Sequence, residues 1–210
     1  MALNLFGVTF NEAHGSHEAH GSPTEAAPGT ELVVVRDLAA IVGESEYAVL
    51  EPTPERVTRY TEVVGDFARR GPVLPAPVGV VFKQRDSVQR WLELHYVALS
   101  DALSFVDNRV VGRVHVWRPG PAEDREAGAD LAAAAADSLR ILRRSAVTTV
   151  PLRTEKVTGI VLSAAFLVEQ DSWKEFASEV AEQGRRAPDL RFELTGPWPP
   201  YDFVQMQLGA

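Results

Sequence analysis

The most constraining feature of the chain is a regular succession of strand and helix patterns in its second half. Strand patterns alternate apolar and polar side chains or run as short apolar stretches, whereas helix patterns repeat apolar residues every three to four positions. Six segments show one of these patterns in turn: 109–117, 122–144, 147–152, 159–168, 172–184 and 190–195. The order that they predict is strand, helix, strand, strand, helix, strand.

That order is typical of the split β-α-β unit of ferredoxin-like folds. An amphipathic helix is expected just before the unit, over residues 86–103. We therefore predict an α+β fold with two domains and a boundary between residues 106 and 107. An irregular α+β domain is expected at 1–106, and a ferredoxin-like domain that ends in a proline- and aromatic-rich segment is expected at 107–210.

Two further helices carry signals at their N-termini. Thr53 can cap a helix that has Pro54 at its first position, and Ser172 with Glu175 forms a capping-box pattern. Regularly spaced apolar side chains are expected to form the buried faces of these helices, namely Val57, Tyr60, Val64 and Phe67 in the first and Trp173, Phe176, Val180 and Ala181 in the second.

Composition argues against several classes of protein. The 210 residues include no cysteine, so neither a disulfide framework nor a thiolate nucleophile is available. Acidic residues number 29 and basic residues 21, and the formal net charge of −8 disfavours nucleic acid as a partner. The longest apolar run, Ile160 to Val168, spans nine residues, whereas a membrane-spanning helix needs about 20. We therefore expect a soluble, cytoplasmic protein that binds neither nucleic acid nor membrane.

Candidate metal ligands are concentrated in a histidine-bearing stretch near the N-terminus. His14, His17 and His20 recur every three residues, and imidazole groups bind zinc and nickel. The surrounding sequence contains glycine and proline and lacks periodicity, which predicts a loop without a defined coordination geometry. We therefore predict no metal and no other cofactor.

No pattern of catalytic residues stands out. Neither a glycine-rich phosphate-binding motif nor a G-x-S-x-G nucleophile motif is present. His95 falls on the apolar stripe of its expected helix and His115 on the polar face of its strand, where structural roles are more common than acid–base catalysis. The acidic cluster Glu123, Asp124 and Glu126 matches a helix N-terminus, which favours carboxylates. The chain is therefore expected not to be an enzyme.

The most unusual composition is found at residues 193–204, which read ELTGPWPPYDFV, and we call the last nine of these, 196–204, the closing segment. Three prolines in four positions predict a stiff backbone outside helix and sheet, and the aromatic side chains offer large apolar faces. Two interpretations stay open: the aromatic rings fill a groove between the two halves of the chain, or they form a surface for a partner. The candidate partner-binding residues are Pro197, Trp198, Pro199, Pro200, Tyr201 and Phe203.

Three stretches of the chain resemble the gas vesicle protein F/L family. The closing signature of that family is similar to FELTGPWPPYDFV at 192–204, and its central motif is similar, more weakly, to PVLPAPVGVVF at 72–82. Its penultimate strand and helix resemble VLSAAFLVEQDSWKEFASEV at 161–180. The motifs also follow in the same order. The central motif departs from the family at Pro77 and Val78, where an Arg-Phe pair is usual.

The resemblance implies a non-enzymatic accessory protein of gas vesicle formation with a ferredoxin-like second half. Such a protein is expected to contact the small hydrophobic shell protein, and other accessory gas vesicle proteins, during assembly. An alternative follows from the fold, because ferredoxin-like domains also bind small molecules or act as monooxygenase-like enzymes. In that case Trp91, His95 and His115 are the candidates to line a ligand-binding cleft.

Overall fold

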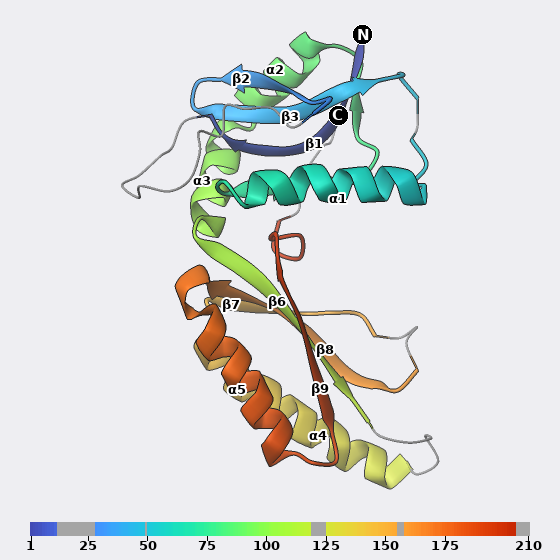
Figure 1. The fold of residues 1–210 in the computed structure, drawn as a ribbon, viewed down its shortest axis with the longest axis vertical. Coiled ribbons are helices and arrows are strands. Elements are labelled where there is room, and N and C mark those ends of the chain that lie inside the picture. The colour runs from blue at the N-terminus through green and yellow to red at the C-terminus, as the bar shows by residue number, and fades with distance from the viewer. Residues whose placement is uncertain (12–27, 49, 119–124, 155–157, 205–210) are drawn as a thin grey trace. The chain divides into compact units, whose positions relative to one another are not determined.

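The computed structural model describes residues 1–11, 28–48, 50–118, 125–154 and 158–204 (Figure 1). The chain forms two compact units. Unit 1 comprises residues 1–108 together with the chain from Pro199 onward, and unit 2 comprises Arg109–Trp198. The two folding domains expected at 1–106 and 107–210 stay a prediction, and the compact units place the last part of the closing segment in unit 1.

Unit 2 alternates strands and helices in the predicted order. Its elements are β6 (Arg109–Trp117), α4 (Arg125–Leu142), β7 (Thr148–Pro151), β8 (Ile160–Glu169), α5 (Trp173–Arg186) and β9 (Arg191–Trp198). The strands form one antiparallel sheet in the order β7-β8-β6-β9. Because β6 and β8 lie side by side in the centre, each strand-helix-strand crossover is split by a third strand, as in ferredoxin-like folds. The predicted α+β fold is therefore confirmed.

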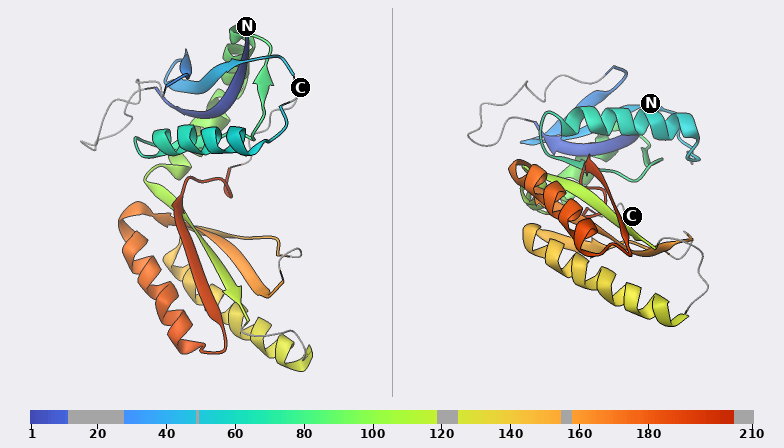
Figure 2. Two further views of the ribbon diagram at one scale, coloured as in Figure 1. Left: turned by 45° about the vertical axis from the view of Figure 1, so that its right-hand side comes forward. Right: turned by 60° about the horizontal axis from the view of Figure 1, so that its bottom comes forward.

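Both helices of unit 2 lie on one face of its sheet (Figure 2). The core beneath them joins apolar residues of β6 and β8 to residues of α4 and α5, and Phe166 stacks at 5.2 Å from Phe176 between ring centroids. Gly112 allows α5 to come close, since a Cβ atom there would lie 3.0 Å from the Trp173 ring and 3.1 Å from the Phe176 ring. This one-sided burial explains the alternating pattern that made β6 predictable.

The start and end of α5 differ from the prediction. A single 3₁₀ turn over Gln170–Ser172 precedes the helix, and the Ser172 side chain forms no capping hydrogen bond. The helix also continues past Gly184 to Arg186. Its buried stripe runs through Phe176, Val180 and Gln183, so Ala181, which was expected to face inward, lies exposed beside that stripe. Three predictions for this helix were therefore wrong: the capping box at Ser172, the end at Gly184 and the inward position of Ala181.

Unit 1 is built around a second antiparallel sheet. Its elements are β1 (Ala2–Phe10), β2 (Glu31–Val35), β3 (Leu38–Ser45), α1 (Pro54–Ala68), β4 (Val73–Pro75), β5 (Val81–Phe82), α2 (Arg85–Leu94) and α3 (Tyr96–Val106). The strands follow the order β2-β3-β1-β4, and β5 also pairs with β1. One edge of β1 therefore pairs with two short strands, β4 and β5, which come from the proline-containing stretch after α1.

Helices cover both faces of the sheet in unit 1. Tyr60, Val64 and Phe67 of α1 pack against Phe6 and Ile41 on one face. The opposite face packs against α2 and α3 through a larger core. Because both faces are covered, β1 and β3 are buried almost continuously instead of on alternate residues.

Two helix predictions in unit 1 need correction. The single helix expected over 86–103 is two helices, α2 and α3, which are separated at His95 by a non-helical backbone (φ −102°, ψ 11°). The change of direction lets α2 pack on β2 and β3 while α3 packs on β1 and β4. In α1, Thr53 caps the helix as predicted by accepting a hydrogen bond from the Arg56 N–H, but Val57 is exposed and Val63 takes its place in the core.

Candidate functional site

The first half of the closing segment is the end of an edge strand in unit 2. The strand β9 continues through Gly196 and Pro197, and Trp198 pairs with Val111 of β6. The prediction that the prolines keep the backbone out of the sheet was therefore wrong for Pro197. An edge strand tolerates proline because one side of it forms no ladder hydrogen bonds. The Gly196–Pro197 peptide bond is cis.

Gly196 has a steric reason to be glycine. Its φ of +129° lies in a region that L-amino acids with a side chain rarely adopt. A Cβ atom built there would lie 2.6 Å from the Val111 carbonyl oxygen and 3.1 Å from the Trp173 ring. The backbone of β9 thus passes too close to β6 and α5 for any other residue, and this fixes the direction in which Trp198 leaves the strand.

Trp198 combines a fixed orientation with an accessible ring. Its indole Nε1–H donates a hydrogen bond to Thr195 Oγ1 at 3.2 Å, while 39% of the residue stays exposed. Pro197 beside it is also exposed. An indole that is held in place by one polar contact and left open on its apolar surface suits contact with an apolar partner.

The second half of the closing segment packs within unit 1. Pro200 is buried, and the Tyr201 ring lies 6.3 Å from the Tyr60 ring between centroids. Two backbone hydrogen bonds fold a tight turn here, from Tyr201 N–H to the Pro199 carbonyl at 2.7 Å and from Phe203 N–H to the Pro200 carbonyl at 3.1 Å. Val204 then packs against the core beneath α2 and α3. This half holds the chain that follows Trp198, as far as Val204, on unit 1.

Tyr60 is the buried residue on which that contact rests. Its hydroxyl donates to the Ala76 carbonyl at 2.5 Å, and burial together with the neighbouring Tyr201 raises the pKa of the Tyr60 hydroxyl far above its ordinary value. The neutral hydroxyl is therefore strongly favoured in the folded protein. The pairing links α1 to the closing segment.

The histidines singled out from the sequence lie in different units. In unit 2, His115 Nδ1 lies 2.6 Å from Ser163 Oγ, and the register also places Glu193 opposite His115 on the neighbouring strand. In unit 1, His95 lies at the α2–α3 break with its ring 5.5 Å from that of Trp91. Buried side-chain nitrogens of these two rings, His95 Nε2 and Trp91 Nε1, have no hydrogen-bond partner among the described residues.

Several predicted features fall outside the part of the chain that the structure describes. These are His14, His17 and His20 and the acidic residues Glu123 and Asp124, while of Glu126 only the backbone is described. Over the remaining residues, the side chains of histidine, aspartate and glutamate form no group of three that could hold a metal ion. Within the same residues no helix has the length and apolar character needed to span a bilayer.

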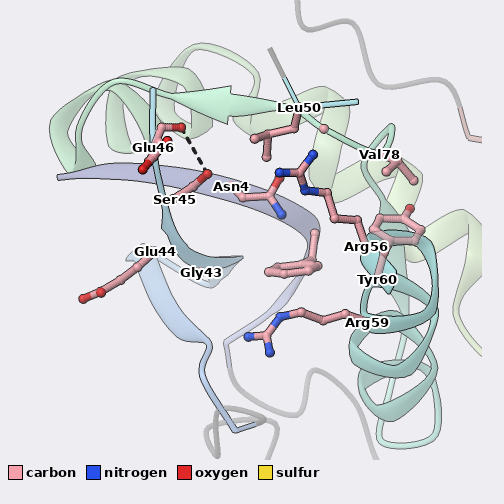
Figure 3. A pocket seen from close by; sticks show the side chains of 12 residues that line it. Asn4, Gly43, Glu44, Ser45, Glu46, Leu50, Arg56, Arg59, Tyr60 and Val78 are labelled. Atoms are coloured by element: carbon pink, nitrogen blue, oxygen red, sulfur yellow. Dashed lines mark hydrogen bonds between the residues drawn. The ribbon is translucent and has the colours of Figure 1, made fainter. Parts of the chain in front are cut away.

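A pocket in unit 1 was not anticipated from the sequence. It has a volume of about 290 Å³ and lies between the end of β3, the first turns of α1 and residues 78–79 (Figure 3). Asn4 and Phe6 of β1 line it from the sheet, and Arg56, Arg59 and Tyr60 line it from α1. Its residues come from four separated stretches of chain, so no local spacing in the sequence could reveal it.

Unit 1 also carries an exposed apolar pair where α2 meets α3. Leu94 is 79% exposed and Val97 is 69% exposed, whereas α2 buries Val88, Trp91 and Leu92 and α3 buries Leu99, Leu103 and Val106. Ala98 extends this exposed surface along α3. Isolated exposed apolar residues are ordinary, but here two large ones flank the break at His95, one in α2 and one in α3, and we call them the exposed patch of unit 1.

Comparison with known proteins gives consistent matches over nearly the whole chain. The family model described as gas vesicle synthesis protein GvpL/GvpF matches residues 3–130 and 118–205. Gas vesicle protein F2 of Halobacterium salinarum is 29% identical over 182 residues, which is 85% of this chain and 81% of that protein. Gas vesicle protein F1 of the same organism is 26% identical over 192 residues, covering 89% of this chain and 87% of that protein.

Solved structures match the fold as well. The crystal structure of the gas vesicle protein GvpF from Anabaena sp. PCC7120 superposes with a TM-score of 0.77 at 14% sequence identity, over 98% of this chain and 99% of that one. The GvpF structure from Microcystis aeruginosa gives a TM-score of 0.74 at the same identity and coverage. At this identity the likeness supports the shared fold alone.

Proposed function

Because the chain belongs to the gas vesicle synthesis protein GvpL/GvpF family, we propose that it binds the small hydrophobic shell protein while gas vesicles are assembled. In this proposal the chain acts in the cytoplasm at the growing vesicle and contacts other accessory gas vesicle proteins there. It catalyses no reaction and needs no cofactor.

The observation that carries this proposal is the accessibility of Trp198 within the closing signature. A signature of this family could be retained only to hold the chain that follows Trp198 on unit 1, as Pro200 and Tyr201 do. Trp198 does not take part in that contact within unit 1, since it ends β9 in unit 2 with a partly exposed ring. Tryptophan is enriched among the residues that dominate binding energy at protein interfaces.

A second contact surface is supplied by the patch at Leu94 and Val97. These side chains are more exposed than Trp198, and no helix or strand of unit 1 covers them. A shell subunit that has not yet polymerised exposes apolar surface, and such surface associates wherever it meets another apolar face. Binding of the apolar surface of the subunit both by Trp198 and by the patch at Leu94 and Val97 would delay self-association until the subunit reaches the growing shell.

The net charge of the chain suits this role. A formal charge of −8 makes complexes of the chain with shell subunits repel one another. Apolar contacts then hold the subunit, while long-range repulsion keeps loaded complexes apart. The same charge gives no reason to expect a nucleic acid partner.

The arrangement around His115 supports a role without catalysis. Ser163, which would be the nucleophile beside this histidine, is only 5% exposed. Its hydroxyl and the imidazole nitrogen are already engaged with each other across two neighbouring strands. A serine that is this deeply buried has no space for a substrate carbonyl beside its hydroxyl, so we assign the pair a structural role.

The proposal is tested by light scattering with the purified shell protein. Diluting that protein from denaturant should give scattering as it self-associates, and an equimolar amount of the chain should delay the rise. Co-purification of the shell protein with the tagged chain should accompany the delay. Unchanged scattering together with no co-purification would contradict the proposal, as would turnover of any substrate by the purified chain.

A further inference from the structure

The pocket of unit 1 presents two arginine side chains whose hydrogen bonds are to backbone carbonyls, and Glu55 is the acidic neighbour of one of them, Arg56. Arg56 and Arg59 lie three positions apart on α1, so their side chains share one side of the helix. Arg56 donates to the Glu51 carbonyl at 2.9 Å, and Arg59 donates to the Gly29 carbonyl at 2.9 Å. Neither forms an ion pair with a carboxylate in the part of the chain that the structure describes. Each guanidinium has five N–H donors, so most donors remain available.

An acceptor faces the same space from the sheet. The side-chain oxygen of Asn4, Oδ1, is buried and accepts no hydrogen bond from any described residue. A buried acceptor without a donor destabilises a protein, so such an atom calls for an explanation. Asn4 points towards Arg56 in Figure 3, whereas the carboxylate of Glu44 points away from both arginines. The pocket thus offers several donors from α1 and the buried acceptor of Asn4, while the carboxylates of Glu44 and Glu46 line its β3 side.

Aromatic and glycine residues shape the apolar part of the pocket. The Phe6 ring also lines the pocket, with the Arg59 guanidinium carbon 6.0 Å from its centroid and the Tyr60 ring 6.4 Å away. Gly43 lets the backbone of β3 pass close to this ring, because a Cβ atom there would lie 3.1 Å from it, and Phe6 is only 3% exposed. The planar guanidinium of Arg59 can bind a carboxylate through two parallel N–H donors.

We propose that this pocket binds a carboxylate carried by a peptide segment of a partner protein. The carboxylate oxygens accept from Arg56 and Arg59, and a neighbouring peptide N–H donates to Asn4 Oδ1. The carboxylate comes either from an aspartate or glutamate side chain or from a chain terminus. This inference goes beyond the proposed function, because it concerns recognition of an acidic, hydrogen-bonding segment instead of the covering of apolar surface.

The test is an NMR titration of the full chain that follows the side-chain Nε–Hε signals of arginine. Three short probe peptides share two leucines: one has an internal aspartate and an amidated end, one has a free terminal carboxylate and no aspartate, and one has asparagine and an amidated end. Each is added to about 10 mM, above the roughly millimolar Kd expected for a small exposed site. We expect the signals of Arg56 and Arg59 to shift with at least one acidic peptide and not with the neutral one.

Variants separate the pocket from general charge effects. Arg56→Gln/Arg59→Gln should weaken binding of the active peptide at least about tenfold, as loss of a paired charge contact commonly does. Asn4→Asp should weaken it as well, because a second carboxylate replaces the acceptor. Arg69→Gln, on the same helix and paired with Asp66, is the matched control and should bind as the parent does. Equal shifts with the neutral peptide, no shift with either acidic peptide, or an equal loss in the control would overturn the proposal.

Discussion

The two halves of the closing segment differ in what surrounds them. Up to Trp198 the segment is the last part of an edge strand, with Pro197 and Trp198 exposed. From Pro199 it belongs to unit 1, where Pro200 is buried and Tyr201 packs against Tyr60. The two halves are rich in the same residue types. Composition alone therefore does not separate a fixed aromatic residue from an accessible one; the packing of each half does.

This difference assigns separate roles to residues that were predicted as one set. We propose that Pro197 and Trp198 contact the partner, and that Pro199, Pro200, Tyr201 and Phe203 hold the chain that follows Trp198 on unit 1. A variant that changes both halves at once would lose stability and binding together and would show neither role. The predictions below therefore change one half at a time.

The largest effect is expected from Gly196→Ala in the first half. The new side chain meets the Val111 carbonyl at 2.6 Å and forces a φ of +129° on alanine, so the free energy of unfolding should fall by about 2–4 kcal/mol. Chemical denaturation measures this. Gly184→Ala in α5 is the control, because a Cβ atom there finds nothing closer than 3.8 Å, and it should be neutral or stabilising by up to about 1 kcal/mol. Equal stability of the two variants would contradict the account of β9.

The next effect is expected from Tyr201→Ala in the second half. Loss of the ring contact with Tyr60 and of partly buried apolar area should lower the free energy of unfolding by about 1–2 kcal/mol. The matched control is Tyr47→Ala, since Tyr47 is 68% exposed and should change stability by less than about 0.5 kcal/mol. If Tyr201→Ala is as stable as this control, the second half does not hold the chain that follows Trp198 on unit 1.

The buried hydroxyl of Tyr60, which packs against Tyr201, should also make the free energy of unfolding depend on pH. The pKa of Tyr60 is raised in the folded protein, so above pH 10 the unfolded chain releases a proton that the folded chain retains. Stability should therefore fall by up to about 1.4 kcal/mol for each pH unit above 10, and be unaffected by this group below that pH. Tyr60→Phe should remove this part of the slope, whereas Tyr47→Phe should keep it. Parallel curves for the two variants would refute the assignment.

A smaller effect is expected from the exposed patch of unit 1. Leu94→Ser/Val97→Ser removes apolar side chains that are largely in water, so stability should change by less than about 0.5 kcal/mol. Affinity for the shell protein should fall about threefold, as for a contact outside the centre of an interface. Ser104→Ala, an exposed position of α3, provides the control. Unchanged affinity would restrict the contact surface to unit 2.

How far the sequence predicts the structure also differs between the units. In unit 2 both helices, α4 and α5, lie on one face of the sheet, so the pattern of β6 alternates, and the order of elements was predictable. In unit 1 helices cover both sheet faces, and the apolar stripe of residues 86–103 gave no sign of the break at His95. That break depends on how two helices meet different strands, which is a tertiary effect.

The candidate sites follow the same division. The closing signature was recognisable because its composition is unusual, and the resemblance that it carried is confirmed by the family match. The role of each of its residues was not predictable, since the backbone leaves unit 2 at Trp198 without any change in composition. The pocket joins Asn4 to Arg56 and Arg59 across more than fifty residues of sequence. From the sequence alone, only the three-residue spacing of the two arginines indicated that their side chains share one side of α1.

The affinity of the shell protein for Trp198→Ala, measured beside Tyr47→Ala, tests the central claim most directly. Both variants remove one exposed aromatic ring, from unit 2 and from unit 1 respectively. We expect Trp198→Ala to bind at least about tenfold more weakly than the parent, at a melting temperature close to that of the parent, and Tyr47→Ala to bind as the parent does. Equal binding by the two variants would show that the accessible half of the closing segment does not hold the shell protein.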